Sequence, residues 1–366
     1  MYDIRFPNLG IVLKNIKDGF TIFGFEIKFY GVIIALGFVL AFLVISKEAK
    51  RTGQSEDTYL DFMLWLIIPA ILGARLYYII FSWDSYFQKG KGFGKTLFDL
   101  IDIRSGGLAI YGGVIAGVIV AIVFAKKQKM KFSVLADTVT MGLLIGQIMG
   151  RWGNFFNQEA FGCNTNSIFG MSGGRIQEWI TDQYPSTTYF ANFGTALDAS
   201  QPVHPCFLYE SVWCLLGFVL LALFAKKIRR YDGQIFLIYI CWYGAERAVV
   251  EGLRTDSLVI GNVRVSQILA ICCVVVSVIL QIAIGTKVKR MGVDYHMYKD
   301  TAESKRMLAE YEAGKTGADT AEDSESNETE STDDTTDTTT EADASDASAD
   351  NDDTATENCE NENEKE

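Results

Sequence analysis

Residues Phe29–Ser46 read FYGVIIALGFVLAFLVIS, a stretch without a single charged side chain. An α-helix needs about 17–25 mostly apolar residues to cross the hydrocarbon core of a bilayer. Six further segments of this kind follow, near Tyr59–Phe81, Leu108–Ala125, Phe132–Gly150, Phe207–Ala225, Ile235–Leu253 and Val265–Ile284. The sequence therefore predicts an all-α polytopic membrane protein with about seven transmembrane helices.

The basic residues between these segments predict the orientation of the chain, because Lys and Arg collect in cytoplasmic loops. Short, dense basic clusters follow the first, third, fifth and seventh segments, at 47–51, 126–131, 226–230 and 287–290. The opposite loops are poorer in basic residues, and 162–201 contains only Arg175. We therefore expect the N-terminus outside and the C-terminus in the cytoplasm.

Three regions are expected from this pattern. Residues 1–28 form an extracytoplasmic N-terminal segment, which lacks the basic start and short apolar core of a cleavable signal peptide. Residues 29–290 form the transmembrane domain, and its outer loop 154–205 contributes to a small extracytoplasmic head. Residues 291–366 form a cytoplasmic tail.

The charge of the chain belongs mainly to this tail. The full sequence of 366 residues has a formal charge of −12, whereas residues 301–366 contain 23 acidic and four basic side chains. From about residue 316 the tail has almost no apolar content, so we expect it to be disordered. The low pI therefore does not indicate a soluble acidic enzyme, and no nucleic-acid partner is expected.

Ionisable groups inside membrane spans are costly and tend to be functional. In the sixth segment, Tyr243, Arg247 and Glu251 are spaced i, i+4, i+8 and lie on one helix face, which Arg254 continues. An arginine facing a cavity suits a phosphate-bearing lipid head group, since guanidinium grips phosphate through two parallel hydrogen bonds. Mutual neutralisation of Arg247 and Glu251 within the bundle is the alternative.

Two other polar stretches interrupt the apolar pattern. The segment 150–162 reads GRWGNFFNQEAFG and packs an arginine, amides and a carboxylate together at the predicted outer end of the fourth span. The segment 105–117, SGGLAIYGGVIAG, places Tyr111 among small residues that otherwise favour close helix packing. The chain has only two histidines, so a multi-histidine metal site is excluded, and no metal or cofactor is expected.

On these residues the chain resembles the prolipoprotein diacylglyceryl transferase family. The signature Gly150-Arg151-x-Gly153-Asn154-Phe155-x-Asn157-x-Glu159-x-x-Gly162 is present in full. Supporting matches are Phe29-Tyr30-Gly31, Gly73–Tyr78, Gly106–Gly117, His204-Pro205 with Leu208-Tyr209-Glu210, Tyr243 to Asp256, and Arg264–Gln267. The resemblance covers about residues 15–290 and leaves the tail outside.

The resemblance implies a bacterial inner-membrane enzyme that acts at the outer leaflet. Such an enzyme moves the diacylglyceryl group of phosphatidylglycerol to the lipobox cysteine thiol of a preprolipoprotein, and glycerol 1-phosphate leaves. The partners are therefore phosphatidylglycerol, lipobox signal peptides and the lipid bilayer.

The resemblance also implies roles for individual residues. Arg151 and Arg247 would hold the phosphate and stabilise charge on the leaving group, and Glu251 would orient Arg247. The expected catalytic residues are Arg151, Arg247, Tyr111 and Glu251, and the expected phosphatidylglycerol-binding residues are Arg151, Tyr30, Asn154, Asn157, Glu159, Tyr243, Arg254, Gly106 and Gly107.

Tyr111 departs from the family pattern, since many members have a histidine there, which is the proposed base for the thiol. A thiol titrates near ~8.5 and tyrosine near ~10, so neutral Tyr111 is a poor general base. Three explanations are open: an arginine activates Tyr111, the substrate phosphate takes the proton, or the residue only positions substrate. We favour positioning.

Two other classes of protein compete with this interpretation. A multi-pass lipid or small-anion transporter could use the same buried arginines, but the sequence shows no internal repeat of the kind that transporters often contain. A structural scaffold would not need Arg247 within the membrane.

Overall fold

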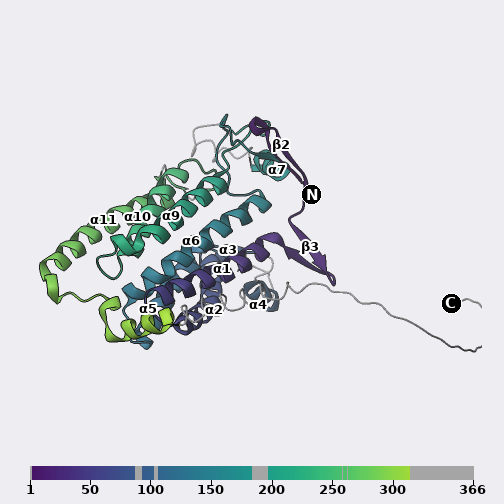
Figure 1. Ribbon diagram of the computed structural model, residues 1–366. Helices are drawn as coiled ribbons and strands as arrows, with labels where there is room; N and C mark the ends of the chain where they lie inside the picture. Colours follow the sequence, from purple (N-terminus) through teal and green to yellow (C-terminus); the bar gives the residue numbers. More distant parts are fainter. Residues whose placement is uncertain are drawn as a thin grey trace, which may run out of the picture. The chain divides into compact units, whose positions relative to one another are not determined.

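The computed structural model describes residues 2–86, 93–102, 106–183, 197–257, 259–261 and 263–313. Its helices are α1 (Phe29–Arg51), α2 (Glu56–Phe81), α3 (Trp83–Tyr86), α4 (Phe93–Ile101), α5 (Ile110–Lys127), α6 (Phe132–Asn157), α7 (Gly174–Gln183), α9 (Cys206–Ile228), α10 (Gln234–Val250) and α11 (Val265–Met291). In the bundle α1 packs along α6, α2 along α5, α6 along α9, and α10 along α11 (Figure 1). Helix α6, which carries the signature, therefore lies between the two halves of the bundle.

Six of the described helices, α1, α2, α5, α6, α9 and α11, are long and apolar enough to cross a membrane. The expected multi-pass helical fold is thus present. The sixth predicted segment, Ile235–Leu253, forms α10, but this helix has only 17 residues and contains Glu246 and Arg247. With 17 residues, α10 is slightly too short to belong to this group.

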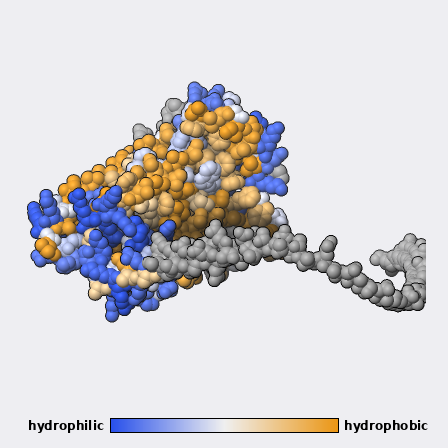
Figure 2. Space-filling model, viewed as in Figure 1, coloured by the Kyte–Doolittle hydropathy of each residue, from blue (hydrophilic) through white to orange (hydrophobic). Residues whose placement is uncertain are grey.

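The surface of the helix bundle is largely apolar, as expected for helices that contact lipid. Figure 2 shows a broad hydrophobic surface over the helices, with hydrophilic residues collected at the two ends. The side chains of Leu64, Leu72 and Ile119 are 58%, 61% and 56% exposed. Exposing so large an apolar surface to water is unfavourable, whereas contact with lipid tails is not.

The prediction of an all-α protein is wrong for the head, which also contains short strands. They are β1 (Tyr2–Phe6), β2 (Ile11–Ile16), β3 (Gly19–Ile22), β4 (Phe25–Lys28), β5 (Ser172–Gly173), β6 (Val259–Ile260) and β7 (Val263–Arg264). Strand β1 lies between β2 and β5, and both pairs are antiparallel. These strands are too short for an alternating pattern to stand out among the apolar helices, so the sequence did not predict them.

The head has a small apolar core of its own. Ile4 of β1 is fully buried and packs in one cluster with Phe161, Met171, Ile176 and Val203. These residues come from the N-terminal segment and from the predicted outer loop 154–205. The core therefore fixes the N-terminus over the end of α6.

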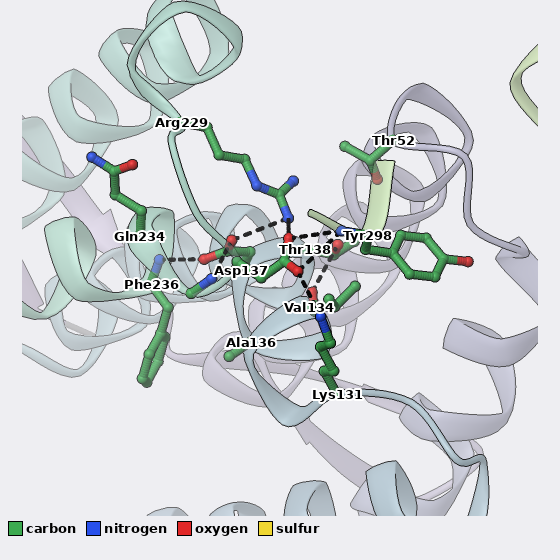
Figure 3. Close-up of polar contacts among 12 residues, drawn as sticks. Thr52, Lys131, Val134, Ala136, Asp137, Thr138, Arg229, Gln234, Phe236 and Tyr298 are labelled. Carbon is green, nitrogen blue, oxygen red and sulfur yellow. Dashed lines mark hydrogen bonds and ion pairs between the residues drawn. The ribbon is translucent and has the colours of Figure 1, made fainter. Parts of the chain in front are cut away.

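At the other end of the bundle, a buried carboxylate joins α6 to the start of α10. Asp137 of α6 accepts hydrogen bonds from the main-chain N–H groups of Gly233 and Phe236, at 2.8 and 2.9 Å. Arg229 lies 3.3 Å from the same carboxylate, and Figure 3 shows Asp137 between Arg229 and Phe236. This group anchors the first turn of α10.

The described part of the tail contacts this same end. Residues 302–313 are helical, and the fully buried Ser304 donates a hydrogen bond of 3.1 Å to the Thr52 carbonyl. The predicted disorder from about residue 316 lies outside the described residues.

Candidate functional site

The candidate site is built around the carboxylate of Glu210, one turn into α9. Glu210 is fully buried, and three arginines converge on it, from α6, from α10 and from the loop after α10. Arg151 of α6 forms an ion pair with Oε2, Arg247 of α10 lies 3.2 Å from the same oxygen, and Arg254 lies 3.5 Å from Oε1. One carboxylate therefore holds three guanidinium groups together where like charges would otherwise separate them.

Two further carboxylates complete this ion-pair network. Glu251 Oε2 lies 2.6 Å from Arg247 Nη2, and Asp256 accepts two hydrogen bonds from Arg254, at 2.9 and 2.7 Å. Burial by itself would raise the pKa of Asp256, but the hydrogen bonds and charge of Arg254 outweigh it and lower the pKa. Asp256 therefore stays ionised and fixes the orientation of Arg254.

The signature residues at the end of α6 extend the network through amides. Asn154 accepts a long hydrogen bond of 3.5 Å from Arg151, and it donates one of 2.9 Å to Oε1 of Glu159. Asn157 donates to the same oxygen at 3.1 Å. The structure thus brings four predicted residues into one chain of contacts, because helix α6 ends between Asn154 and Glu159.

Two tyrosines lie against this group. A Cβ atom on Gly153 would come within 2.5 Å of the ring of Tyr30, so the glycine of the signature lets Tyr30 pack directly on α6. Tyr243 stacks on Tyr239 one turn below, with ring centroids 6.0 Å apart. Tyr239 in turn accepts a hydrogen bond of 2.8 Å from Gln147 of α6, so aromatic residues join α6 and α10 below the arginines.

Tyr111, Gly106 and Gly107 lie in a separate contact group. The carbonyls of the two glycines accept hydrogen bonds of 2.8 and 2.9 Å from Arg75. The Tyr111 hydroxyl is 2.5 Å from Ser266 at the start of α11. Among the described residues, no hydrogen bond or ion pair links Tyr111 to the three arginines.

Three residues in or beside the network were not among the predicted site residues, namely Glu210, Asp256 and Glu246. Glu210 is one of the supporting matches to the family, but no local pattern indicates that it meets the arginines. Glu246 is 5% exposed, and neither carboxyl oxygen finds a hydrogen-bond partner among the described residues. Its electrostatic neighbours are Glu210 and the arginines. The only signal for Glu246 was its charge within an apolar segment.

The arrangement is suited to binding an anion at the membrane. Each guanidinium carries five N–H donors, and Arg151 and Arg247 direct only some of them at Glu210, Asn154 and Glu251. Their side chains remain 18% and 19% exposed, so an incoming phosphate can reach them. The fold and the site define a multi-pass membrane protein with a pre-organised arginine site of the kind that binds phosphate.

Comparison with known proteins gives the family. The profile of the family described as prolipoprotein diacylglyceryl transferase matches residues 18–283. A protein of Finegoldia magna named phosphatidylglycerol–prolipoprotein diacylglyceryl transferase is 43% identical over 266 residues, which are 73% of this chain and 94% of the relative.

Two further relatives carry the same name. The protein of Bacillus mycoides is 41% identical over 256 residues, 70% of this chain and 87% of its own. That of Listeria monocytogenes is 40% identical over 274 residues, 74% of this chain and 90% of its own. The chain belongs to the prolipoprotein diacylglyceryl transferase family, and these relatives do not favour the transporter alternative.

Proposed function

We propose that the protein transfers the diacylglyceryl group of phosphatidylglycerol to the lipobox cysteine thiol of preprolipoproteins and releases glycerol 1-phosphate. The observation that carries the proposal is the meeting of Arg151, Arg247 and Arg254 on the buried Glu210. A phosphodiester lipid has one anionic phosphate, and converging guanidinium groups match it in charge and geometry. Membership in the family supports the same reaction.

In this proposal the lipid phosphate lies against Arg151 and Arg247. Their alignment is fixed before substrate arrives, since Glu210 and Glu251 already hold the two guanidinium groups. Pre-organised donors stabilise charge that grows on a leaving group without any reorganisation of the site. The catalytic contribution of Glu251 is therefore to position Arg247.

The other predicted residues surround the lipid head group. Glu159 collects the amides of Asn154 and Asn157 next to Arg151, which supports a role in ordering the head group. Tyr30 and Tyr243 contribute aromatic walls, and Arg254 adds positive charge from the loop after α10. Gly106 exposes main chain that a lipid can approach closely, and the adjoining Gly107 packs against Arg75 and Tyr78.

The reaction proceeds by displacement at carbon. The thiol sulfur attacks the glyceryl carbon that carries the phosphate ester, so a carbon–sulfur bond forms and the carbon–oxygen bond breaks. The electron pair stays on the oxygen of glycerol 1-phosphate, and the thiol proton goes to that phosphate. The hydrogen bond between Tyr111 and Ser266 supports a positioning role for Tyr111 rather than a role as base.

The proposal includes the arrangement in the bacterial inner membrane. Helix α10 adds a seventh span to the six long ones, and its 17 residues make about 25 Å of helix, close to the thickness of the hydrocarbon core. The basic clusters place the Asp137 end in the cytoplasm and the head outside. The arginine site then lies at the outer leaflet, where secreted precursors and phosphatidylglycerol meet.

The test uses purified full-length protein in phosphatidylglycerol vesicles with a synthetic lipobox peptide. We expect the peptide mass to rise by one diacylglyceryl group on its cysteine, with glycerol 1-phosphate in the supernatant. The product should be absent with a Cys→Ser peptide and in vesicles of phosphatidylcholine alone. A folded protein that leaves the peptide mass unchanged would refute the proposal.

A further inference from the structure

A cavity of about 610 Å³ lies between the head and the end of α6. Binding sites for small molecules commonly measure roughly 300–1,000 Å³. Its lining residues come from the β3–β4 region, the start of α1, the end of α6, helix α7 and the loop after α10. The cavity is therefore enclosed by parts of the chain that only the folded head brings together.

One wall of this cavity belongs to the site already described. Tyr30, Asn157 and Glu159 line it, and so does Asp256, which holds Arg254 at 2.7 Å. Through Glu159 and Asn154 the wall is also in contact with Arg151. A molecule in the cavity is thus directly beside the arginine network.

A second wall of the cavity is formed by the head, and it meets the first where Arg175 donates a hydrogen bond of 3.4 Å to the Asn157 carbonyl. It consists of Asp18, Lys28, Arg175 and Trp179. Asp18 accepts hydrogen bonds from Lys28 at 2.9 Å and from Arg175 at 3.0 Å, and Trp179 lies edge-on to Phe161 with ring centroids 5.2 Å apart. We call these four residues the head wall.

The composition of the head wall indicates which of the two substrates, the lipid acyl chains or the acceptor polypeptide, lies against it. Acyl chains need an apolar environment, and a wall with three charged side chains would leave those charges against hydrocarbon. A polypeptide backbone, in contrast, brings its own donors and acceptors and packs well against an aromatic ring. The acceptor is a polypeptide whose cysteine must reach the lipid while the chain beyond it leaves the membrane.

We propose that this cavity binds the residues that follow the acceptor cysteine, with the head wall as their contact surface. The inference rests on the proposed function and assigns the second substrate to the head wall, which contains none of the residues proposed for the lipid. The wall pairs its own positive and negative charges, so it suits a short, uncharged polar segment.

The test asks whether charges placed after the acceptor cysteine of a peptide interact with the charged side chains of the head wall. Three lipobox peptides are compared in phosphatidylglycerol vesicles: one with two aspartates after the cysteine, one with two lysines, and one that ends at the cysteine amide. The quantity measured is the ratio of KM for the acidic peptide to KM for the basic peptide.

Two substitutions in the head wall should shift this ratio in opposite directions. Lys28→Gln removes a positive charge and should raise the ratio about threefold, whereas Asp18→Asn removes a negative charge and should lower it by a similar factor. Lys14→Gln is the matched control, because Lys14 is an exposed lysine on β2 outside the cavity. It should leave the ratio at the wild-type value.

A merely structural role for the head wall would not give shifts of opposite sign. It would change KM for both charged peptides and for the truncated peptide together. An unchanged ratio in both variants, or equal changes with the peptide that ends at the cysteine, would overturn the inference. Absence of transfer by the wild-type protein with any peptide would instead refute the proposed function.

Discussion

Two buried carboxylates, Glu210 and Asp137, lie at opposite ends of the helix bundle and bind arginine in different ways. Asp137 accepts hydrogen bonds through both oxygens from main-chain N–H groups at the start of α10, and among the described residues it pairs with one arginine, Arg229. Glu210 contacts the side chains of three arginines from α6, α10 and the following loop. The first carboxylate therefore fixes the backbone, and the second collects positive charge.

The difference separates a structural site from a binding site made of the same residue types. The main-chain donors cannot turn away from Asp137 unless the start of α10 unfolds, so these hydrogen bonds persist in the folded protein (Figure 3). Arginine side chains can redirect their donors to an incoming anion while Glu210 holds them in place. Substitutions at the two ends should accordingly affect different properties.

The largest effect is expected from Arg151→Lys compared with Arg229→Lys. Lysine keeps the charge but cannot make two parallel hydrogen bonds to phosphate. Loss of a donor that stabilises the leaving group costs about 10²–10³ in rate, so transfer by Arg151→Lys should fall by that factor. Arg229→Lys should stay within about twofold of wild type. Equal losses of transfer rate in both variants would show that the arginines at Glu210 and at Asp137 do not differ in their roles.

The next effect concerns stability and is expected from Asp137→Asn. Removal of one member of a buried ion pair typically costs about 3–5 kcal/mol, and Asp137 is 3% exposed. The midpoint of thermal unfolding in detergent should therefore fall clearly, while the transfer rate per folded molecule stays the same. If Asp137→Asn kept the wild-type unfolding midpoint but lost diacylglyceryl transfer, Asp137 would belong to the catalytic site and would not be a structural residue.

A smaller effect is expected from Tyr111→Phe, which removes the hydroxyl bonded to Ser266. A hydrogen bond of this kind contributes about 0.5–1.5 kcal/mol, so turnover should change by less than about tenfold. Ser266→Ala removes the partner and should have an effect of the same size. Loss of turnover by several orders of magnitude in Tyr111→Phe alone would show that the hydroxyl takes part in proton transfer.

The smallest effect concerns pH and the head. Hydrogen bonds from Lys28 and Arg175 lower the pKa of Asp18 to about 2, below the ordinary value of about 3.9. The folded protein therefore binds a proton there less readily than the unfolded chain, so the stabilisation is complete above about pH 4 and disappears as the pH falls towards 2. The difference in unfolding midpoint between wild type and Asp18→Asn should shrink over that interval. A constant difference would show that the charge of Asp18 does not stabilise the head.

The sequence predicted the helical framework well, because crossing a membrane is a matter of local length and hydropathy. It located the starts of α1, α2, α5, α6, α9 and α11 within three residues, but its segments stop up to seven residues before α6 and α11 end. It missed the strands of the head, where pairing between β1 and β5 joins residues far apart in the chain. It also treated α10 as equivalent to the other spans, although this helix has only 17 residues.

The site shows the same division. The polar residues of the signature are near one another in sequence, so their contacts around Glu159 follow from the end of one helix. Glu210 and Glu246 could not be assigned from sequence, because their importance depends on which helices face each other. The separation of Tyr111 from the arginine network was equally invisible, since it depends on the packing of α5 against α2 and on the contact with α11.

The sequence by itself determined that this protein is a multi-pass membrane protein and, through its long signature, to which family it belongs. Both follow from residues that are adjacent in the chain. The tertiary structure alone decided that Glu210 gathers arginines 37 and 44 residues away. It also decided that Asp18 and Lys28 of the N-terminal segment border a cavity at the end of α6. Distances across the fold depend on how the helices pack, which no local pattern in the sequence specifies.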